Sequence, residues 1–241
     1  MLNRLQFTAS ALSVLAMPRV ALAADTPPAP TAAQTAVEGI VADFSARAHA
    51  AGLPATVVTP VVVFRTTPAL SVFTPQGILI AQWSELPPPA QAQFDAWAAV
   101  AGSSWTGARL FEEMFHWFLV PHEMTHWVQT RGGTQRLTDR YATEVEANRV
   151  AVAYWRRSDA GRARLDTLAA GLTSLHAKMP SPVPTGADPA QYFQTNYGTL
   201  AVDPNAYGWY QLRMVIDAYR AADAPPFDTA LHALIARTYQ S

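Results

Sequence analysis

The sequence predicts an α+β domain that is mostly helical and has a small β-sheet near its N-terminus. Short runs of β-branched and apolar residues occur between positions 56 and 83, and helical spacing of apolar residues, with Gly and Pro breaks, continues from there onward. Strands followed by helices favour α+β over an alternating α/β arrangement. Half of the 241 residues are apolar and only 15% are charged, so one domain with a good core is expected.

The first 24 residues have the layout of a secretory signal peptide. Arg4 precedes an apolar stretch of about 11 residues that ends at Met17, and the small residues of Ala21-Leu22-Ala23 follow. The stretch is shorter than the roughly 20 residues that a membrane span needs. We expect cleavage after Ala23 or Ala24, a periplasmic or secreted mature protein, and no stable membrane span. The alternative is a disordered or amphipathic N-terminus of a cytosolic protein.

Residues 25–35 are rich in Pro, Ala and Thr and lack the periodicity needed to bury a face. They are therefore expected to form a flexible leader, with the folded domain over 36–241. Helical apolar spacing predicts the first helix over 37–50, with Gly52 just after its end. Strands are then expected, at 56–64, 70–73 and 78–83.

The last two of these strands are expected to form a hairpin. They flank Thr74-Pro75-Gln76-Gly77, in which Pro at the second place and Gly at the fourth suit a type I turn. Asp203 followed by Pro204 is typical of a helix start, because it combines an N-cap side chain with a residue preset for the first turn. The helices expected after the hairpin are at 90–100, 107–130, 138–157, 161–178, 204–222 and 227–239.

Charge and cysteine content exclude several classes of function. The chain has 17 basic and 18 acidic residues and no run of Lys or Arg that could follow a phosphate backbone, so nucleic acid is not an expected partner. It has no cysteine, which excludes disulfides, thiol catalysis and Cys-ligated metal sites. Any metal ion must therefore be held by His and carboxylate groups.

The most informative motif is His122-Glu123-Met124-Thr125-His126, which lies in an apolar and aromatic stretch. On a helix, side chains four residues apart lie on one face, so both imidazoles can reach one ion, and zinc is the natural occupant. Glu123 can lean over the open position of the ion and take a proton from water. The alternative is a pair of core histidines that are hydrogen-bonded to the backbone.

A catalytic zinc ion needs a third protein ligand, and Glu144 and Glu146 both follow on the next predicted helix. At 100° per residue, Glu146 shares a face with two arginines, whereas Glu144 shares one with mostly small and apolar residues, namely Asn148, Ala151, Val152 and Trp155. The face of Glu144 is therefore expected to point inward and that of Glu146 to be solvated, with an ion pair to Arg149. This makes Glu144 the predicted ligand. Asn148 is expected to hold the second nitrogen of a ligating His or the neighbouring backbone.

These residues resemble the gluzincin group of zinc metallopeptidases, in which a Glu on a second helix completes the site and an Asp or Asn follows four residues later. The likeness covers about residues 122–155 of the chain. It implies a zincin-like fold with the small sheet beside the motif helix. It also implies Zn²⁺ held by His122, His126 and Glu144, Glu123 as the base, and a peptide or protein substrate.

Two features depart from this group. Asn148 is neutral where many members have Asp, which weakens the electrostatic support of the His. Pro121 directly precedes His122, and its ring would clash with the carbonyl of residue 117 in a regular helix. The motif helix is therefore expected either to kink or to start anew at Pro121.

The resemblance also implies a sheet edge beside the zinc ion, along which an extended peptide forms main-chain hydrogen bonds. The strand at 78–83 is the candidate edge, and an ordinary interior strand is the equally open alternative. Such enzymes commonly use a Tyr or His to stabilise the oxyanion. Tyr207, in the aromatic cluster at 207–211, is the candidate, with aromatic packing on the core as the alternative.

The sequence therefore predicts an exported zinc metallopeptidase that hydrolyses peptide bonds with zinc-activated water. An endopeptidase is expected rather than an exopeptidase, because no motif for binding a chain terminus is evident. The alternative is a zinc-binding but catalytically inactive scaffold that binds peptide or envelope polymer, and the intact Glu123 argues against it. A third hypothesis is a helical adaptor in which the His pair is incidental.

Overall fold

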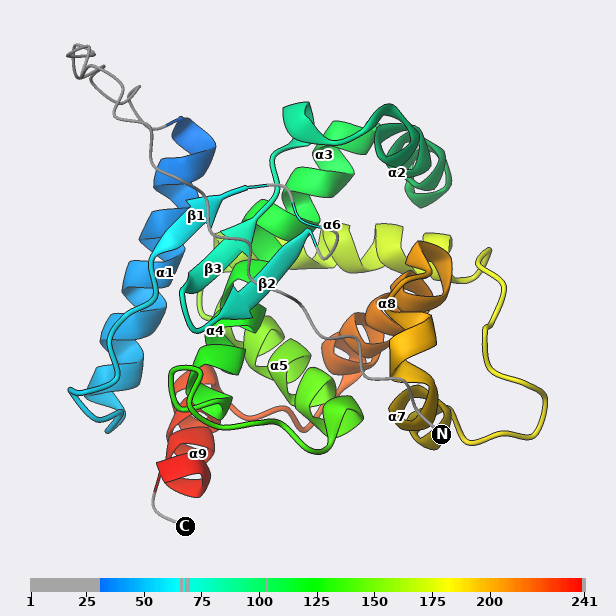
Figure 1. Ribbon diagram of the computed structural model, residues 1–241. Coiled ribbons are helices and arrows are strands. Elements are labelled where there is room, and N and C mark those ends of the chain that lie inside the picture. The colour runs from blue at the N-terminus through cyan, green and yellow to red at the C-terminus, as the bar shows by residue number, and fades with distance from the viewer. Residues whose placement is uncertain (1–30, 66, 68–69, 103, 240–241) are drawn as a thin grey trace, which may run out of the picture. The chain divides into compact units, whose positions relative to one another are not determined.

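The computed structural model describes residues 31–65, 67, 70–102 and 104–239. This part of the chain is mostly helical and has one small sheet, as the sequence predicts (Figure 1). The predicted signal peptide, and the predicted leader up to residue 30, lie outside the described residues. No helix within the described ranges is long and apolar enough to cross a lipid bilayer.

The helices and strands follow the predicted order. The strands are β1 (Val62–Phe64), β2 (Ser71–Thr74) and β3 (Gly77–Ile80). The helices are α1 (Ala32–Ala50), the short 3₁₀ helix η1 (Trp83–Glu85), α2 (Pro88–Ala101), α3 (Gly107–Phe111), the π-helical segment η2 (Glu112–Phe118), α4 (Leu119–Gln129), α5 (Arg140–Trp155), α6 (Asp159–His176), α7 (Pro189–Leu200), α8 (Pro204–Arg220) and α9 (Phe227–Tyr239).

Two of these helices differ from the prediction for local reasons. Helix α1 begins at Ala32, inside the predicted leader, because Thr31 and Gln34 form a capping box in which each side chain bonds to the backbone N–H of the other. Helix α7 was not predicted, and only Phe193 and Leu200 of its residues are buried. Its start nevertheless carries a local signal, an Asp188 N-cap followed by Pro189.

The sheet has the strand order β1-β3-β2. Strands β2 and β3 form the predicted antiparallel hairpin, with Phe73 opposite Ile78, and β1 pairs with β3 in parallel. Gly77 has φ 137°, and a Cβ atom there would lie 2.4 Å from the carbonyl oxygen of Val61, so the close approach of β3 to the chain before β1 requires glycine. Because β3 is paired on both edges, the expectation that the strand at 78–83 is a free edge is wrong. The interior-strand alternative is correct.

The motif helix runs without a restart through α3, η2 and α4. Phe118 and Leu119 already have right-handed helical dihedrals, so the helix does not start anew at Pro121. The N–H of Leu119 instead bonds to the carbonyl of Met114, five residues back, which is the π-helical pattern. This wider turn shifts the preceding carbonyls out of α-helical register, and it thereby accommodates the Pro121 ring without ending the helix.

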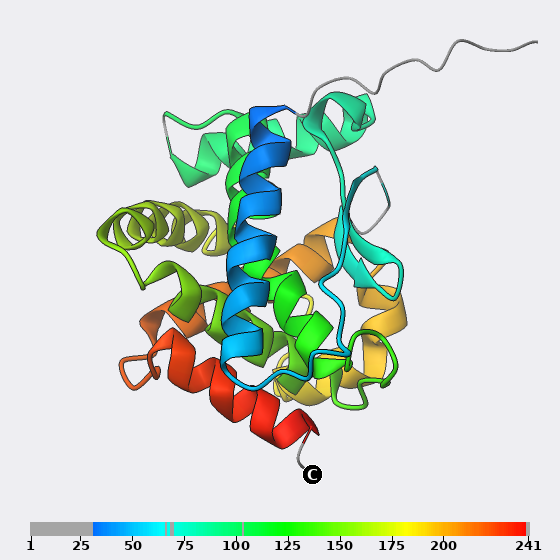
Figure 2. The same ribbon diagram turned by 90° about the vertical axis from the view of Figure 1, so that its left-hand side faces the viewer.

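Helix α4 is the centre of the packing. Helix α1 lies along α4 and η2 (Figure 2), and the sheet covers another side of α4 through β2 (Figure 1). Helix α5 packs against α4, and both also contact α9. The aromatic side chains of Phe44, Phe118 and Trp127 are almost fully buried in this region. The packed pair α4 and α5 carries all the residues of the predicted metal site.

Candidate metal centre

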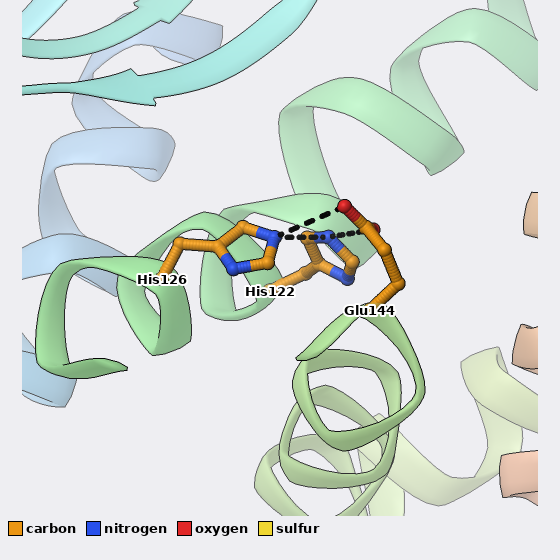
Figure 3. Close-up of side chains that lie close together, drawn as sticks. All are labelled: His122, His126 and Glu144. Atoms are coloured by element: carbon orange, nitrogen blue, oxygen red, sulfur yellow. Dashed lines mark hydrogen bonds and ion pairs between the residues drawn. The ribbon is translucent and has the colours of Figure 1, made fainter. Parts of the chain in front are cut away.

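The side chains of His122, His126 and Glu144 point toward one another across the contact between α4 and α5 (Figure 3). The two imidazole Nε2 atoms are 3.0 Å apart. Glu144 Oε2 lies 3.2 Å from Nε2 of His122, and Glu144 Oε1 lies 3.7 Å from Nε2 of His126. The three side chains are 4%, 12% and 13% exposed, so solvent reaches them only narrowly. The structure thus brings the three predicted ligands together.

These separations fit a zinc ion. Zinc bonds of about 2.0–2.1 Å in a tetrahedral site put neighbouring ligand atoms about 3.3 Å apart, close to the observed spacings of the two nitrogens and the nearer carboxylate oxygen. Two imidazoles and a carboxylate are also the donor set of several catalytic zinc sites. Within the described part of the chain, this is the one group of three or more His, Asp or Glu side chains whose ligand atoms converge in this way.

The hydrogen bonds on the far side of each ring leave Nε2 for an ion. Asn148, which is fully buried, donates from Nδ2 to the backbone oxygen of Glu144 at 3.0 Å, so its Oδ1 faces His122 Nδ1 at 3.3 Å. His122 Nδ1 therefore carries a proton, so that in the neutral ring, the form that binds a metal ion, the lone pair is on Nε2. Asn148 thus bonds to both the His and the backbone, where the sequence analysis expected one or the other. His126 Nδ1 faces Oε1 of Gln129 at 2.8 Å.

The charges at the site reinforce one another. Burial disfavours the ionised form of Glu144, but the hydrogen bond from His122 and the positive charges of His126 and His122 outweigh burial and lower the pKa of Glu144 to about 2. Burial likewise acts to lower the pKa of His122, and the hydrogen bond and negative charge of Glu144 overcome it, so that this pKa is raised. The ionised Glu144 that favours a proton on His122 would also favour a metal cation in place of that proton.

Glu123 is buried and bonded to the sheet. Its Oε2 accepts the backbone N–H of Phe73 at 2.7 Å. Phe73 is on β2, an edge strand of the sheet, and its N–H points to Glu123 and away from β3. The sheet edge beside the motif helix is therefore β2, which replaces the predicted strand at 78–83.

Tyr207 is linked to Glu144, one of the predicted ligands, through the side chain of Gln211. Gln211 Nε2 donates to Glu144 Oε2 at 2.9 Å and to Tyr207 Oη at 3.0 Å. Burial first, and then the negative charge of Glu144, raise the pKa of Tyr207 well above its ordinary value, so the phenol keeps its proton at neutral pH. The Tyr207 ring also packs against Phe193 and Tyr197, so aromatic packing and proximity to the site coexist.

The two glutamates of α5 have different surroundings, partly as predicted. The face of Glu144 is buried at Asn148, Ala151 and Val152. The face of Glu146 is not wholly solvated, because Ala153 and Tyr154 are buried there. The Tyr154 ring packs on Phe44 of α1 and Phe227 of α9.

The expected ion pair between Glu146 and Arg149 is not formed. Glu146 instead accepts hydrogen bonds from Arg237 of α9 and from Gln129 Nε2, the latter at 3.0 Å, whereas Arg149 is exposed. Helical spacing alone suggested Arg149, but α9 brings Arg237 to the same carboxylate.

Three groups at the site were missed by sequence reasoning. Gln129 follows His126 by three residues and Gln211 follows Tyr207 by four, so helical spacing could have pointed to both. The N–H of Phe73 has no counterpart in a sequence pattern, because any residue except proline offers the same group.

No protein family, curated protein or solved structure matches this chain. The interpretation of the site therefore depends on its residues and their geometry.

Proposed function

We propose that the protein is a zinc-dependent peptidase with a zincin-like domain, in which His122, His126 and Glu144 bind the metal ion and Glu123 is the general base. The observation that carries this proposal is the convergence of three ligand atoms, with the Nε2 atoms 3.0 Å apart and Glu144 Oε2 at 3.2 Å, next to a buried carboxylate that directly follows the first His. A structural zinc site would be expected to have four protein ligands, whereas a three-ligand site leaves one position open.

A bound zinc ion would polarise the scissile carbonyl and make water a stronger acid. Glu123 is proposed to accept a proton from the attacking water and to pass it to the leaving amine. The N–H of Phe73 holds one oxygen of Glu123, which orients the carboxylate and leaves its other oxygen for the proton. Tyr207, which keeps its proton, is proposed to donate a hydrogen bond to the oxyanion.

The outer edge of β2 is the proposed binding edge for an extended peptide or protein substrate. Main-chain hydrogen bonds to a sheet edge hold a peptide without requiring particular side chains. This choice of edge is supported by the Phe73 N–H, which points outward from β2 and contacts Glu123, the proposed base. An endopeptidase is the preferred form of the proposal. Removal of residues 1–24 on export to the periplasm or the exterior is a further part of it.

The proposal is tested on the purified chain, prepared without chelators. Zinc is measured by atomic emission, and the zinc-loaded protein is incubated with a peptide library whose products are identified by mass spectrometry. We expect about one zinc ion per chain and cleavage within peptides. Stoichiometric zinc without cleavage would favour the inactive scaffold. Absence of zinc would refute both the peptidase and the zinc-binding scaffold hypotheses.

Glu123→Gln is the decisive variant, with Glu112→Gln as its matched control on an exposed position of η2. The amide has a similar shape but cannot accept the proton, so turnover should fall by about 10² to 10⁴ while zinc content is unchanged. The control should keep the activity of the unmodified protein. Full activity of Glu123→Gln would exclude Glu123 as the base.

A further inference from the structure

We propose that Gln129, held by Glu146, fixes His126 in the tautomer that can bind a metal ion. This inference rests on the metal-binding part of the proposed function and is independent of peptidase activity. Gln129 is a buried residue at the end of α4, and its side-chain amide lies between His126 and helix α5. Gln129 and Glu146 both act through His126 and so are positioning residues.

The orientation of the Gln129 amide follows from its neighbours. One end of the amide faces two acceptors on α5, the carbonyl of Thr143 at 3.2 Å and the carboxylate of Glu146 at 3.0 Å. Neither acceptor has a proton to give, so this end must be the NH₂ group, which has two hydrogens for two acceptors. The other end is therefore the carbonyl oxygen, which lies 2.8 Å from Nδ1 of His126.

The fixed amide in turn decides where His126 carries its proton. A neutral imidazole can hold the proton on either nitrogen, and the partner of one nitrogen sets the state of the other. Because Gln129 offers an acceptor to Nδ1, the proton stays on Nδ1. Nε2 then keeps its lone pair, 3.0 Å from Nε2 of His122 and 3.7 Å from Glu144 Oε1. With the proton on Nε2, the ring would instead donate to the carboxylate and could not bind an ion.

Glu146 strengthens this arrangement from outside. The Glu146 side chain is 34% exposed. Its carboxylate forms an ion pair with Arg237 of α9 and accepts a hydrogen bond from the Gln129 amide. A carboxylate is a stronger hydrogen-bond acceptor than a backbone carbonyl. Glu146 therefore adds to the effect of the Thr143 carbonyl in keeping the NH₂ group of Gln129 toward α5 and its oxygen toward His126. The glutamate that is not a ligand thereby contributes to the metal site through Gln129.

The test uses the full chain and two readouts, neither of which requires activity. The tautomer of His126 in the metal-free protein is measured by ¹⁵N NMR at a pH at which its ring is neutral, and zinc affinity is measured by competition with a chelator. In the unmodified protein we expect the Nδ1–H form of His126. This result can be obtained even if the protein cleaves no peptide.

Gln129→Leu removes the acceptor and should populate the Nε2–H form of His126, with zinc binding weakened by about 10- to 100-fold, as for other partners of metal-bound His. The proton on His122 Nδ1, which Asn148 holds, should stay in place. If Gln129→Leu keeps both the Nδ1–H form and the original affinity, the proposal is wrong.

Glu146→Ala provides a second test at a partly exposed position. Thr143 still holds the amide in this variant, so zinc affinity should fall by less, about threefold to tenfold. Arg149→Ala is the matched control, one turn away on the same helix and exposed, and should leave affinity unchanged. Equal affinities for the two variants would remove Glu146 from the proposed arrangement.

Discussion

Replacing Glu144 with alanine tests the proposed metal site most directly, because it removes one of the three proposed ligands and leaves both imidazoles in place. The substitution deletes the carboxylate whose oxygens lie 3.2 Å and 3.7 Å from the two Nε2 atoms. Zinc sites with four protein ligands bind with apparent free energies of about 10–16 kcal/mol, or roughly 2.5–4 kcal/mol per ligand. Loss of one ligand should therefore weaken zinc binding by about two to three orders of magnitude.

The assay compares Glu144→Ala with Glu146→Ala, which has the same change of residue two positions along the same helix. Zinc is measured by atomic emission after dialysis, and affinity by chelator competition. Glu144→Ala should lose most of its zinc, whereas Glu146→Ala should still reach one zinc ion per chain when zinc is in excess.

A Glu144→Ala protein with unchanged zinc affinity would refute the assignment of the third ligand. A zinc-free Glu146→Ala beside a zinc-replete Glu144→Ala would reverse it. Circular dichroism of both variants checks that neither result reflects unfolding, since Glu144 also accepts a hydrogen bond from Gln211.

Two further predictions concern Tyr207 and Asp43. Tyr207→Phe should lower kcat by about 10² to 10³ with little change in KM or zinc content, because it removes one oxyanion donor and keeps the ring; unchanged kcat would exclude that role. Burial acts to raise the pKa of Asp43, but hydrogen bonds from Tyr154 and Arg157 outweigh burial and lower this pKa below 3.8. The stability that the ionised Asp43 contributes is therefore present above pH 3.8 and is lost as the pH falls through the lowered pKa. Since the Asp43 side chain is 41% exposed, this contribution should be below about 1 kcal/mol, and urea unfolding at pH 7 and pH 3 should show a smaller acid-induced loss for Asp43→Asn than for the unmodified protein.

Features that depend on a few neighbouring residues could be predicted from the sequence. The four-residue spacing of His122 and His126 puts both rings on one helix face, and the Pro and Gly of the 74–77 turn predict the hairpin that is observed. Asp203 and Pro204 mark the start of α8 at the predicted residue. Where local signals were overlooked, as at α7 and the first turn of α1, the prediction failed.

Features that join distant segments could not be predicted in this way. Strand order made β2 the edge, and the N–H of Phe73 contacts Glu123 across 50 residues of sequence. Gln211 contacts Glu144 across 67 residues, and the partner of Glu146 is on α9 and not on its own helix.

The amino-acid sequence by itself therefore determined the residue types of the candidate ligands, their spacing along α4, and the inward face of α5 that carries Glu144. Tertiary structure alone decided which groups surround those ligands. The physical reason is that helix and turn geometry is set within about four residues, whereas contacts between helices depend on how apolar faces from the whole chain pack together. Gln129 shows both contributions, since helical spacing puts it beside His126, and the approach of α5 orients its amide.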